Sequence, residues 1–367
     1  MSRPVVITGG GTGGHLFPMV AVADALQYAN VSARDIYLVA SSRGKDRELL
    51  ADRLNPITLL PGRGLVRSRS LLHLGQNLYS AAQLAVACVV SIVLVIRWRP
   101  RAVVSLGGYG ALAMDLAAVI TRTPLVLVVP DATYGGTHRV VRRFAVACCT
   151  AVSSTTTREI VTGTPIRREI QEVVRGSDHS RYEARDKSRA WNIAVMTGSL
   201  GASSVNNAVL DLAQRWAHRE DIVITHVTGQ RDFAAMTRRR SETDCANYQQ
   251  IAFGEMSSIY ATCDVAVCRA GASSVAELCF LGIPSILVPL PNAPGDHQAV
   301  NARIMSDAGA SVVVSDTELS AERLASELNS LFETPGRLRD MAAAARTLRR
   351  TDAAHEIATV VLRVARG

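Results

Sequence analysis

Short apolar runs alternate with longer amphipathic stretches along the whole chain. Runs rich in β-branched and aliphatic residues predict buried strands at 5–8, 36–40, 102–106, 125–129, 193–197, 222–227, 265–268, 285–289 and 311–314. The stretches between them predict helices, the first at about 19–29 and the last over 321–366 with a break at Pro335-Gly336. Strands that alternate with helices form parallel sheets with crossover connections. The chain is therefore predicted to have an α/β fold.

The predicted strands fall into two sets. The segment between them, 175–190, is polar, charged and almost devoid of apolar residues, which is typical of a linker or an exposed loop. A chain of 367 residues also exceeds the ~100–200 residues of one typical core. We therefore expect two Rossmann-like domains, each with its own parallel sheet and core.

A glycine-rich turn follows the first strand and carries the most informative chemistry in the chain. Five of the six residues from 9 to 14 are glycine, and His15 follows them directly. Bare backbone amides in such a turn, at the start of the next helix, can hold phosphate groups or sugar hydroxyls. The imidazole of His15 would project into the same crevice, which predicts a ligand-binding or catalytic residue. The alternative is a histidine that only packs against the helix or caps it.

The same turn admits another class of enzyme. Gly9, Gly11 and Gly14 satisfy the G-x-G-x-x-G fingerprint of dinucleotide-binding proteins. After the second strand the chain has Ser-Ser-Arg at 41–43 rather than the acidic residue that would bind a ribose 2′-hydroxyl. Arg43 would suit a 2′-phosphate, so an NADP-binding reductase remains an alternative.

Glycine-rich turns follow three more of the predicted strands, at 107–110, 198–204 and 269–277. In open parallel sheets, ligands bind beyond the carboxyl ends of the strands. Because both sets of strands offer such a turn, we expect the ligand to lie between the two domains.

The turn at 269–277 leads into a predicted helix. Ser273 and Ser274 would place hydroxyls and free N–H groups at its start, where they can hold a diphosphate, and Glu277 can accept hydrogen bonds from ribose hydroxyls. The alternative is a capping box, in which Ser274 and Glu277 serve only the helix. A proline-rich segment at 289–301 brings Asp-His-Gln to the start of another helix. These polar side chains favour a sugar-nucleotide pocket.

Several chemistries find no support in the sequence. No D-x-D motif occurs, so a metal bridging a nucleotide diphosphate lacks its usual ligands, and helix N-termini, serine hydroxyls and Arg167 would have to stabilise the leaving group. No G-x-S-x-G elbow of a hydrolase occurs. Seven cysteines without a C-x-x-C pair fit neither a disulfide framework nor a zinc site and favour the reducing cytoplasm. The first residues do not resemble a signal peptide.

Charge and hydropathy point to a membrane surface. A net charge of +8, with 5% aromatic residues and no nucleic-acid-binding motif, predicts a phosphate-bearing substrate or an anionic membrane as partner and no nucleic acid. The segment 77–96 is uncharged and long enough to span a bilayer. It could also be a purely buried helix, or a helix with one face in the membrane interface. Basic residues flank it on both sides, at Arg63, Arg67, Arg69, His73, Arg97, Arg99 and Arg101.

In order and spacing, these motifs resemble those of the MurG family, the undecaprenyl-diphospho-muramoylpentapeptide β-N-acetylglucosaminyltransferases of glycosyltransferase family 28. The matching segments cover nearly the whole chain. They are Gly-Gly-Gly-Thr-Gly-Gly-His-Leu-Phe-Pro at 9–18, Gly-Gly-Tyr at 107–109, Gly-Thr-Pro-Ile-Arg at 163–167, Gly-Ser-x-Gly-Ala at 198–202, Cys-Arg-Ala-Gly-Ala at 268–272 with Glu277, and Asp-His-Gln at 296–298 with Asn-Ala at 301–302.

The resemblance implies a GT-B fold, in which two Rossmann-like domains with parallel sheets face an interdomain cleft. It implies a metal-independent, inverting transfer of GlcNAc from UDP-GlcNAc to a polyprenyl-linked acceptor, with no cofactor. The enzyme would be cytoplasmic and peripheral on the inner face of the plasma membrane. Residues 1–163 would form the acceptor-binding, membrane-facing domain and 164–350 the UDP-sugar-binding domain, with a helix at 351–367 packing back on the first.

Carried over residue by residue, the resemblance makes His15 the general base, because an imidazole titrates near neutral pH and can take a proton from an acceptor hydroxyl. The donor would be held by Arg167, Ser199, the backbone near Phe253, Ala272, Ser273, Ser274, Glu277 and Gln298. The acceptor and sugar side would be formed by Thr12, Gly13, Gly14, Tyr109 and Asp131.

The chain departs from the family on the acceptor side. Val-Val-Pro-Asp at 128–131 stands where the family usually has His-Glu-Gln-Asn, and Gly-Ala-Leu-Ala at 110–113 replaces a Ser-Gly-Pro run. The leading hypothesis is therefore a hexosamine transferase that uses UDP-GlcNAc and a lipid-linked or amphiphilic acceptor in a specialised antibiotic or glycolipid pathway. The alternatives are housekeeping synthesis of lipid II from lipid I, transfer to diacylglycerol, the NADP-binding reductase, and a non-catalytic sugar-nucleotide-binding protein.

Overall fold

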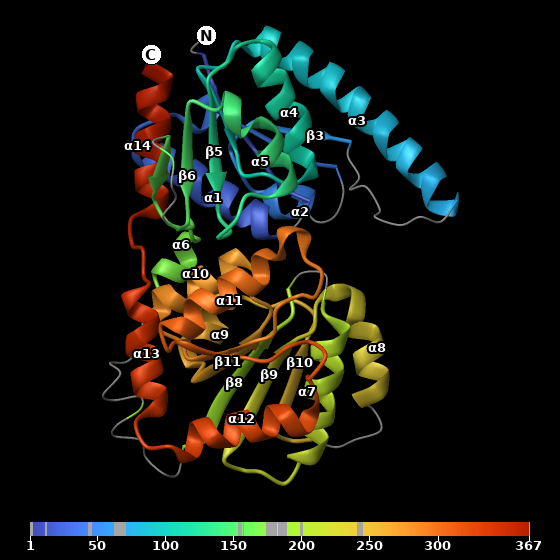
Figure 1. Cartoon of the computed structure of the whole chain (residues 1–367), viewed down its shortest axis with the longest axis vertical. Helices are drawn as coiled ribbons and strands as arrows, with labels where there is room; N and C mark the ends of the chain where they lie inside the picture. The colour runs from blue at the N-terminus through green and yellow to red at the C-terminus, as the bar shows by residue number, and fades with distance from the viewer. Residues whose placement is uncertain are drawn as a thin grey trace. The chain divides into compact units, whose positions relative to one another are not determined.

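The chain forms two compact units, one of Met1–Arg167 together with Asp352–Gly367 and one of Arg168–Thr351. Each unit has a parallel sheet flanked by helices (Figure 1). This confirms the predicted α/β class. The structure is a computed structural model that describes residues 3–11, 13–42, 46–61, 71–152, 156, 158–173, 182, 189–198, 201–240 and 245–366.

The sheet of the first unit has seven strands in the order β3-β2-β1-β4-β5-β6-β7. Every neighbouring pair is parallel, so the carboxyl ends of the strands share one edge. The strands are β1 (Val5–Thr8), β2 (Ile36–Ser41), β3 (Ile57–Leu60), β4 (Ala102–Ser105), β5 (Leu125–Val129), β6 (Ala147–Thr150) and β7 (Glu159–Val161).

Helices cover both faces of this sheet. Side chains alternate along β1, so that Val5 and Ile7 join one apolar cluster with α1 and α14, whereas Val6 joins another with α3 and α4. Strands buried on both faces have continuous apolar sequences, as β5 has. The helices are α1 (Gly13–Tyr28), α2 (Asp46–Leu50), α3 (Leu71–Trp98), α4 (Tyr109–Ile120), α5 (Gly136–Val141) and α14 (Ala353–Arg366), with 3-10 turns at Ala33–Asp35 and Arg142–Phe144.

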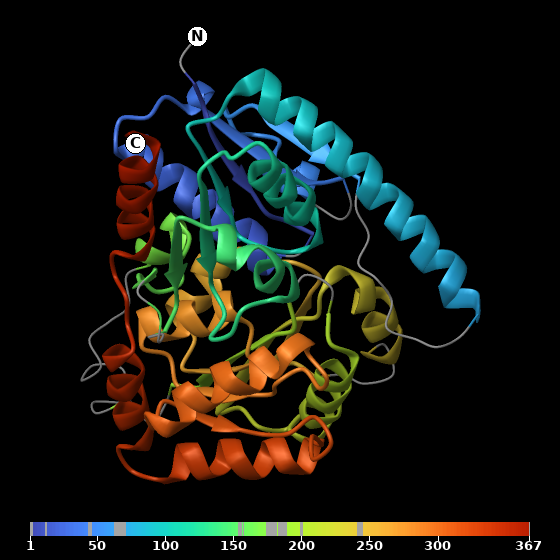
Figure 2. The ribbon, with the colours of Figure 1, turned by 45° about the horizontal axis from the view of Figure 1, so that its top comes forward.

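The long helix α3 lies at the outside of the first unit (Figure 2). It is buried on one face only. Its inner face carries Ser80, Ala87, Ser91 and Val95, which are at most 4% exposed. Asn77–Trp98 is long and apolar enough to cross a membrane, and 22% of its apolar window is buried. The alternative of a purely buried helix is therefore wrong. The outer face exposes Leu78, Tyr79, Val86, Val89, Val90, Val93 and Ile96, each by 38% or more.

The sheet of the second unit has six strands in the order β10-β9-β8-β11-β12-β13. All its pairs are parallel as well. The strands are β8 (Trp191–Met196), β9 (Ile222–Val227), β10 (Tyr248–Ile251), β11 (Val265–Cys268), β12 (Ser285–Leu287) and β13 (Ser311–Val313).

One large apolar cluster forms the core of this unit between the sheet and helices α7 and α12. At its margin the rings of Trp191 and Phe332 stack with centroids 4.8 Å apart. The helices are α6 (Arg168–Gln171), α7 (Ser203–Arg215), α8 (Gln230–Arg240), α9 (Met256–Thr262), α10 (Ala272–Leu281), α11 (His297–Asp307), α12 (Ala321–Glu333) and α13 (Arg337–Thr347), with a 3-10 turn at Pro294–Asp296.

All the predicted strands are present, with ends that differ by a residue or two. Four further strands were not predicted: β3, β6, β7 and β10. Each lacks the signal of a long apolar run, because β7 has three residues, β6 reads Ala-Cys-Cys-Thr and β10 contains two glutamines. Neighbouring strands, rather than their own composition, determine these segments.

The first helix begins earlier than predicted. The sequence places its start near residue 19, after Pro18, whereas α1 begins at Gly13 and contains Pro18. Proline lacks the N–H group that a helix interior uses, which makes it a natural signal for a helix start. The correction matters because His15 lies in the first turn of α1 rather than in the loop before it.

Candidate functional site

Three neighbouring strands of the first unit bring their following turns together. In the order β2-β1-β4, the carboxyl ends of the strands lead to the segment that contains Asp46, the glycine turn at 9–11 and Gly107-Gly108. This convergence follows from the parallel topology, because sequence-distant turns meet at one edge of the sheet. His15 stands at the start of α1, beside this edge, and is half-buried.

The turn after β4 packs tightly against the glycine turn and His15. Gly108 has a φ of 83°, and a Cβ atom there would lie 2.8 Å from the carbonyl oxygen of Gly10 and 3.3 Å from Nδ1 of His15. Only glycine allows both this backbone conformation and this approach. The two glycine motifs of the first unit therefore form one structure around the imidazole.

Asp46 is a residue of this site that the sequence analysis missed. Its Oδ2 atom accepts hydrogen bonds from the backbone N–H groups of Gly11 at 2.7 Å and Ser41 at 3.2 Å. Burial raises the pKa of this carboxyl, while the two backbone hydrogen bonds oppose the shift. Asp46 begins α2 and ties the glycine turn to the end of β2. Its place directly after Arg-Gly-Lys at 43–45 gives no signal of this role in the sequence.

Behind the turn at 107–108 lies a buried polar trio that was not predicted either. Ser105, at the end of β4, donates a hydrogen bond to Oδ2 of Asp115 at 3.0 Å, and its Oγ lies 3.2 Å from Nε2 of His138. All three residues are at most 2% exposed. Burial raises the pKa of Asp115 to about 7, although the hydrogen bond from Ser105 opposes the shift. Burial, helped by the nearby charge of His15, lowers the pKa of His138 to about 3.

We expect Asp115→Asn to raise the melting temperature of the first unit at pH 8 more than at pH 5. The folded protein holds the Asp115 proton more tightly than the unfolded chain, so stability is lost as pH rises from about 4 through about 7. The cost above pH 7 is at most roughly 4 kcal/mol. Asparagine carries no charge, so the variant avoids the cost of burying an ionised carboxylate.

Scanning calorimetry at the two pH values measures this difference. The matched control is Asp340→Asn, since the side chain of Asp340 is 69% exposed. Equal changes in melting temperature at pH 5 and pH 8 for Asp115→Asn would contradict the prediction.

The other predicted residues of the acceptor side are distributed along the same unit. Gly13 and Gly14 are the first residues of α1, Tyr109 begins α4, and Asp131 follows β5 and is partly buried. Thr12 lies outside the described residues.

Arg167, predicted to bind the donor, belongs to the first unit. Its guanidinium lies over the ring of Phe17, 4.1 Å from the centroid, on the helix that carries His15. The segment that leads to it is fixed by Thr164, whose hydroxyl donates a hydrogen bond to the carbonyl of Pro130 at 2.7 Å. The structure thus places a cation near the start of α1.

Three neighbouring strands of the second unit present the predicted donor motifs. In the order β8-β11-β12, the strands are followed by Thr197 and Gly198, by Arg269-Ala270-Gly271 and by the loop that enters α11. Ser199 lies outside the described residues. Phe253 follows β10 and is 45% exposed.

Helix α10 begins at Ala272 with Gly271 as its N-cap. Ser274 is therefore inside the helix, and the alternative of a capping box between Ser274 and Glu277 is wrong. Glu277 is 4% exposed and its Oε2 atom accepts a hydrogen bond from the hydroxyl of Tyr260 at 2.9 Å. The Ser273 hydroxyl is buried and has no hydrogen-bond partner among the described residues. The helix start thus combines free N–H groups with a serine hydroxyl.

Side chains of α11 and of the turn after β11 hold the loops around this helix start. Asn301 donates a hydrogen bond to the carbonyl of Ala270 at 3.0 Å, and Gln298 accepts one from the N–H of Leu290 at 2.9 Å. Arg269 bonds to Asp316 at 2.6 Å and to the hydroxyl of Ser204 at 2.8 Å. These contacts fix the start of α7, the turn after β11 and the loop after β12 relative to one another within the unit.

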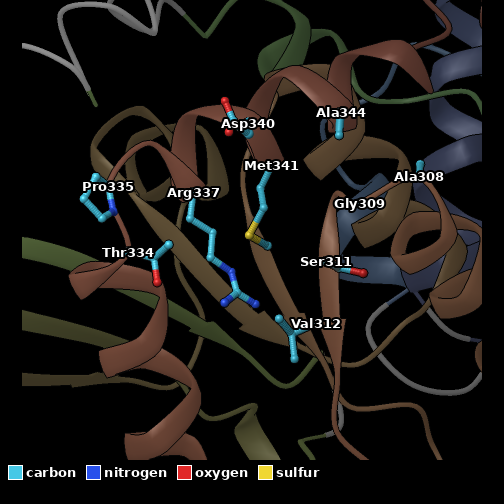
Figure 3. A pocket seen from close by; sticks show the side chains of 10 residues that line it. All are labelled: Ala308, Gly309, Ser311, Val312, Thr334, Pro335, Arg337, Asp340, Met341 and Ala344. Carbon is cyan, nitrogen blue, oxygen red and sulfur yellow. The ribbon is translucent and has the colours of Figure 1, made fainter.

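A surface hollow of about 520 Å³ in the second unit lies away from these residues. Figure 3 shows the side chains of Arg337 and Met341 in it, beside β13. It contains none of the predicted site residues, so we do not identify it with the site. The hollow is lined by Ala308, Gly309, Ser311, Val312, Thr334, Pro335, Arg337, Asp340, Met341 and Ala344.

Among the residues that the structure describes, no group of three or more His, Cys, Asp or Glu side chains could hold a metal ion.

Comparison with known proteins defines the class. Residues 5–149 match the glycosyltransferase family 28 N-terminal domain and residues 192–357 its C-terminal domain. The structure of MurG from Acinetobacter baumannii is similar with a TM-score of 0.74 and 25% identity, covering 99% of this chain and 100% of that one. The glycosyltransferase of kitacinnamycin, at 14% identity and a TM-score of 0.68, shares the fold. The protein is a GT-B glycosyltransferase.

Curated relatives narrow the class further. A protein of Alkalilimnicola ehrlichii is 36% identical over 100% of both chains, and one of Desulforudis audaxviator is 32% identical over 98% of both. Both are named UDP-N-acetylglucosamine--N-acetylmuramyl-(pentapeptide) pyrophosphoryl-undecaprenol N-acetylglucosamine transferase. The chain belongs to glycosyltransferase family 28 and, within it, to the MurG family.

Proposed function

We propose that this glycosyltransferase moves GlcNAc from UDP-GlcNAc to a lipid-linked acceptor at a membrane surface. The observation that carries the proposal is the likeness, over the full length, to relatives whose names state this donor and a pyrophosphoryl-undecaprenol acceptor. The organised starts of α1 and α10 support it, since each can receive an anionic or hydroxyl-rich ligand. The first acceptor that we propose is N-acetylmuramyl-(pentapeptide) pyrophosphoryl-undecaprenol, which the relatives' names state.

In the proposed reaction the acceptor hydroxyl attacks C1 of the sugar and its proton passes to the imidazole of His15. A bond forms between the acceptor oxygen and C1 while the bond from C1 to the diphosphate breaks on the opposite side, which inverts the anomeric centre. The diphosphate leaves with the electron pair. Free N–H groups at the start of α10, with the hydroxyls of Ser273 and Ser274, stabilise its charge without a metal.

An acceptor other than lipid I is the second candidate. At the end of β5, Val128 and Val129 are at most 3% exposed, and Pro130 follows, so within 128–131 the polar side chain is that of Asp131. The family usually carries three polar residues more at these positions. A smaller set of hydrogen-bonding groups suits an acceptor with fewer polar groups near the reacting hydroxyl.

Binding and transfer assays test the function. Calorimetry with UDP-GlcNAc, UDP-glucose, UDP-galacturonate and NADPH should show the tightest binding for UDP-GlcNAc, and labelled UDP-GlcNAc should transfer its sugar to undecaprenyl-diphospho-muramoylpentapeptide in vesicles. Binding of NADPH without binding of any UDP-sugar would overturn the proposal. Transfer to extracted lipids but not to the muramoylpentapeptide lipid would favour the second candidate.

We expect Glu277→Ala to weaken UDP-GlcNAc binding by ~10- to 100-fold, because a hydrogen bond to a carboxylate contributes about 1.5–3 kcal/mol. The matched control is Tyr260→Phe, which removes the hydroxyl that bonds to Glu277 and leaves the carboxylate in place. Calorimetry measures both. An unchanged dissociation constant for Glu277→Ala would remove Glu277 from the donor site.

The exposed face of α3 supports the proposed membrane contact. Its apolar residues form a stripe along one side of the helix, opposite the face that packs on the unit. Contiguous exposed apolar surface of this kind marks an interaction site. Arg97 and Arg99 follow the stripe, and a net charge of +8 favours anionic lipid. We propose that α3 lies in the interface, because a span would bring its packed polar unit into the bilayer. Arg67 and Arg69 lie outside the described residues.

A further inference from the structure

The buried trio of Ser105, Asp115 and His138 joins three elements of the first unit. Ser105 ends β4, Asp115 lies in α4 and His138 in α5. The Ser105 hydroxyl is the hub, 3.0 Å from Oδ2 of Asp115 and 3.2 Å from Nε2 of His138. A third contact comes from the backbone N–H of Gly107, which donates to Ser105 Oγ at 3.3 Å. The trio is thus bonded directly to the turn that follows β4.

That turn separates two imidazoles. A Cβ atom on Gly107 would lie 3.1 Å from Cε1 and 3.2 Å from Nε2 of His138, and one on Gly108 would lie 3.3 Å from Nδ1 of His15. Both glycines have a φ of 83°. His138 therefore lies next to Gly107 and His15 next to Gly108, at consecutive residues of the same turn. A shift of the trio therefore moves the backbone that packs against the His15 ring.

The hydrogen bonds of the trio depend on one another. Ser105 has one proton to donate, and it also accepts from Gly107. If Asp115 is ionised, Ser105 donates to it and Nε2 of His138 must carry a proton. If Asp115 is protonated, it donates to Ser105, which then donates to Nε2, and the His138 proton moves to Nδ1. Both arrangements leave His138 uncharged, which its burial requires.

We propose that Ser105, Asp115 and His138 are positioning residues for His15. They hold the Gly107-Gly108 turn against the His15 ring and keep the second imidazole uncharged, so that no positive charge behind the turn opposes protonation of His15. The role as a positioning network rests on the proposed function of His15 as general base. Residues that fix the surroundings of a catalytic group commonly affect how much that group contributes to the rate.

Four variants test this in the full chain. Ser105→Ala removes the hydroxyl to which the other groups bond, and His138→Leu replaces the imidazole by an apolar side chain. His138→Gln keeps an amide near the position of Nε2 and should rescue part of the loss. The matched control is Ser91→Ala, which removes another fully buried serine hydroxyl of the same unit, on α3. Thermal unfolding first confirms that each variant is folded, and Ser105→Cys, whose thiol is only a weak donor and acceptor, replaces Ser105→Ala or His138→Leu if either is not.

We expect Ser105→Ala and His138→Leu to lower kcat by ~10- to 100-fold, with the KM for UDP-GlcNAc unchanged. Ser91→Ala should leave both constants near those of the parent protein. In a His15→Ala background, Ser105→Ala should cause no further loss, because the network acts through the ring that is already absent. An equal further loss in that background would overturn the proposal.

A direct reading comes from NMR of histidines labelled at Cε1, with the His15 signal assigned by its loss in His15→Ala. We expect Ser105→Ala, but not Ser91→Ala, to change the chemical shift and the titration midpoint of His15. An unchanged His15 signal in Ser105→Ala and His138→Leu would overturn the positioning role whatever the kinetics. If instead His15→Ala keeps full turnover, the base role of His15 fails, and the NMR comparison still decides whether the trio positions the ring.

Discussion

Replacing His15 by Ala should lower kcat by ~10²–10⁴ and leave the binding of UDP-GlcNAc nearly unchanged. General-base catalysis by a positioned imidazole contributes a factor of this size, and its loss affects the transition state rather than the bound donor. Apart from Arg167, the residues predicted to bind the donor belong to the second unit, whereas His15 lies in the first turn of α1 in the first unit. Steady-state kinetics with calorimetry of donor binding separates the two quantities.

The matched control is His355→Ala, because His355 is an exposed histidine of the same unit, on α14. Its substitution should leave kcat near that of the parent protein. Intact turnover of His15→Ala would remove His15 from the base role and leave it as a residue that packs at the start of α1. A tenfold or greater loss of donor affinity would assign it to binding instead.

Replacing Val86, Val89 and Val93 on the outer face of α3 by Glu should release the protein from anionic vesicles. Val86, Val89 and Val93 are 57%, 62% and 57% exposed and lie on one side of the helix. Burying a valine side chain stabilises by roughly 1.5–3 kcal/mol, so losing three such contacts and adding three negative charges should lower binding by several orders of magnitude. Sedimentation with liposomes that contain anionic lipid measures the bound fraction.

A substitution elsewhere separates the membrane effect from a general effect of charge. Val223, on β9 of the second unit, is 37% exposed, and Val223→Glu should sediment with vesicles as the parent protein does. The α3 variant should keep its affinity for UDP-GlcNAc and lose transfer to an acceptor embedded in vesicles. Unchanged sedimentation of the α3 variant would exclude this face as the membrane contact.

The alternation of strands and helices could be predicted from the sequence because it depends on local signals. Apolar runs such as 125–129 and 265–268 define strands by composition, and the break at Pro335-Gly336 separates α12 from α13 as predicted. The glycine turns at 9–14 and 107–110 follow strands, so the topology of a parallel sheet already places them at one edge. Family membership follows from the same motifs.

Side-chain partners distant in the chain could not be predicted in this way. Asp46 bonds to the N–H of Gly11 across 35 positions, and His138 meets Ser105 across 33. No periodicity or motif in the sequence predicts either pair, because each depends on how two separate segments of the chain pack together. The burial of one face of α3 is likewise set by α4 and the sheet, whereas the hydropathy of 77–96 is the same for a buried, interfacial or spanning helix.

The path of the chain has a consequence for biosynthesis. The first unit begins at the N-terminus, but Ile357 and Val361 of α14 belong to the same apolar cluster as Val22 and Leu26 of α1. A ribosome therefore produces the whole second unit before the last piece of the first core exists. Although domains usually fold in the order of their synthesis, the nascent first unit keeps an uncovered apolar strip on α1 until α14 emerges. Premature termination between residue 167 and the start of α14 should thus yield an aggregation-prone fragment rather than an independent half of the enzyme.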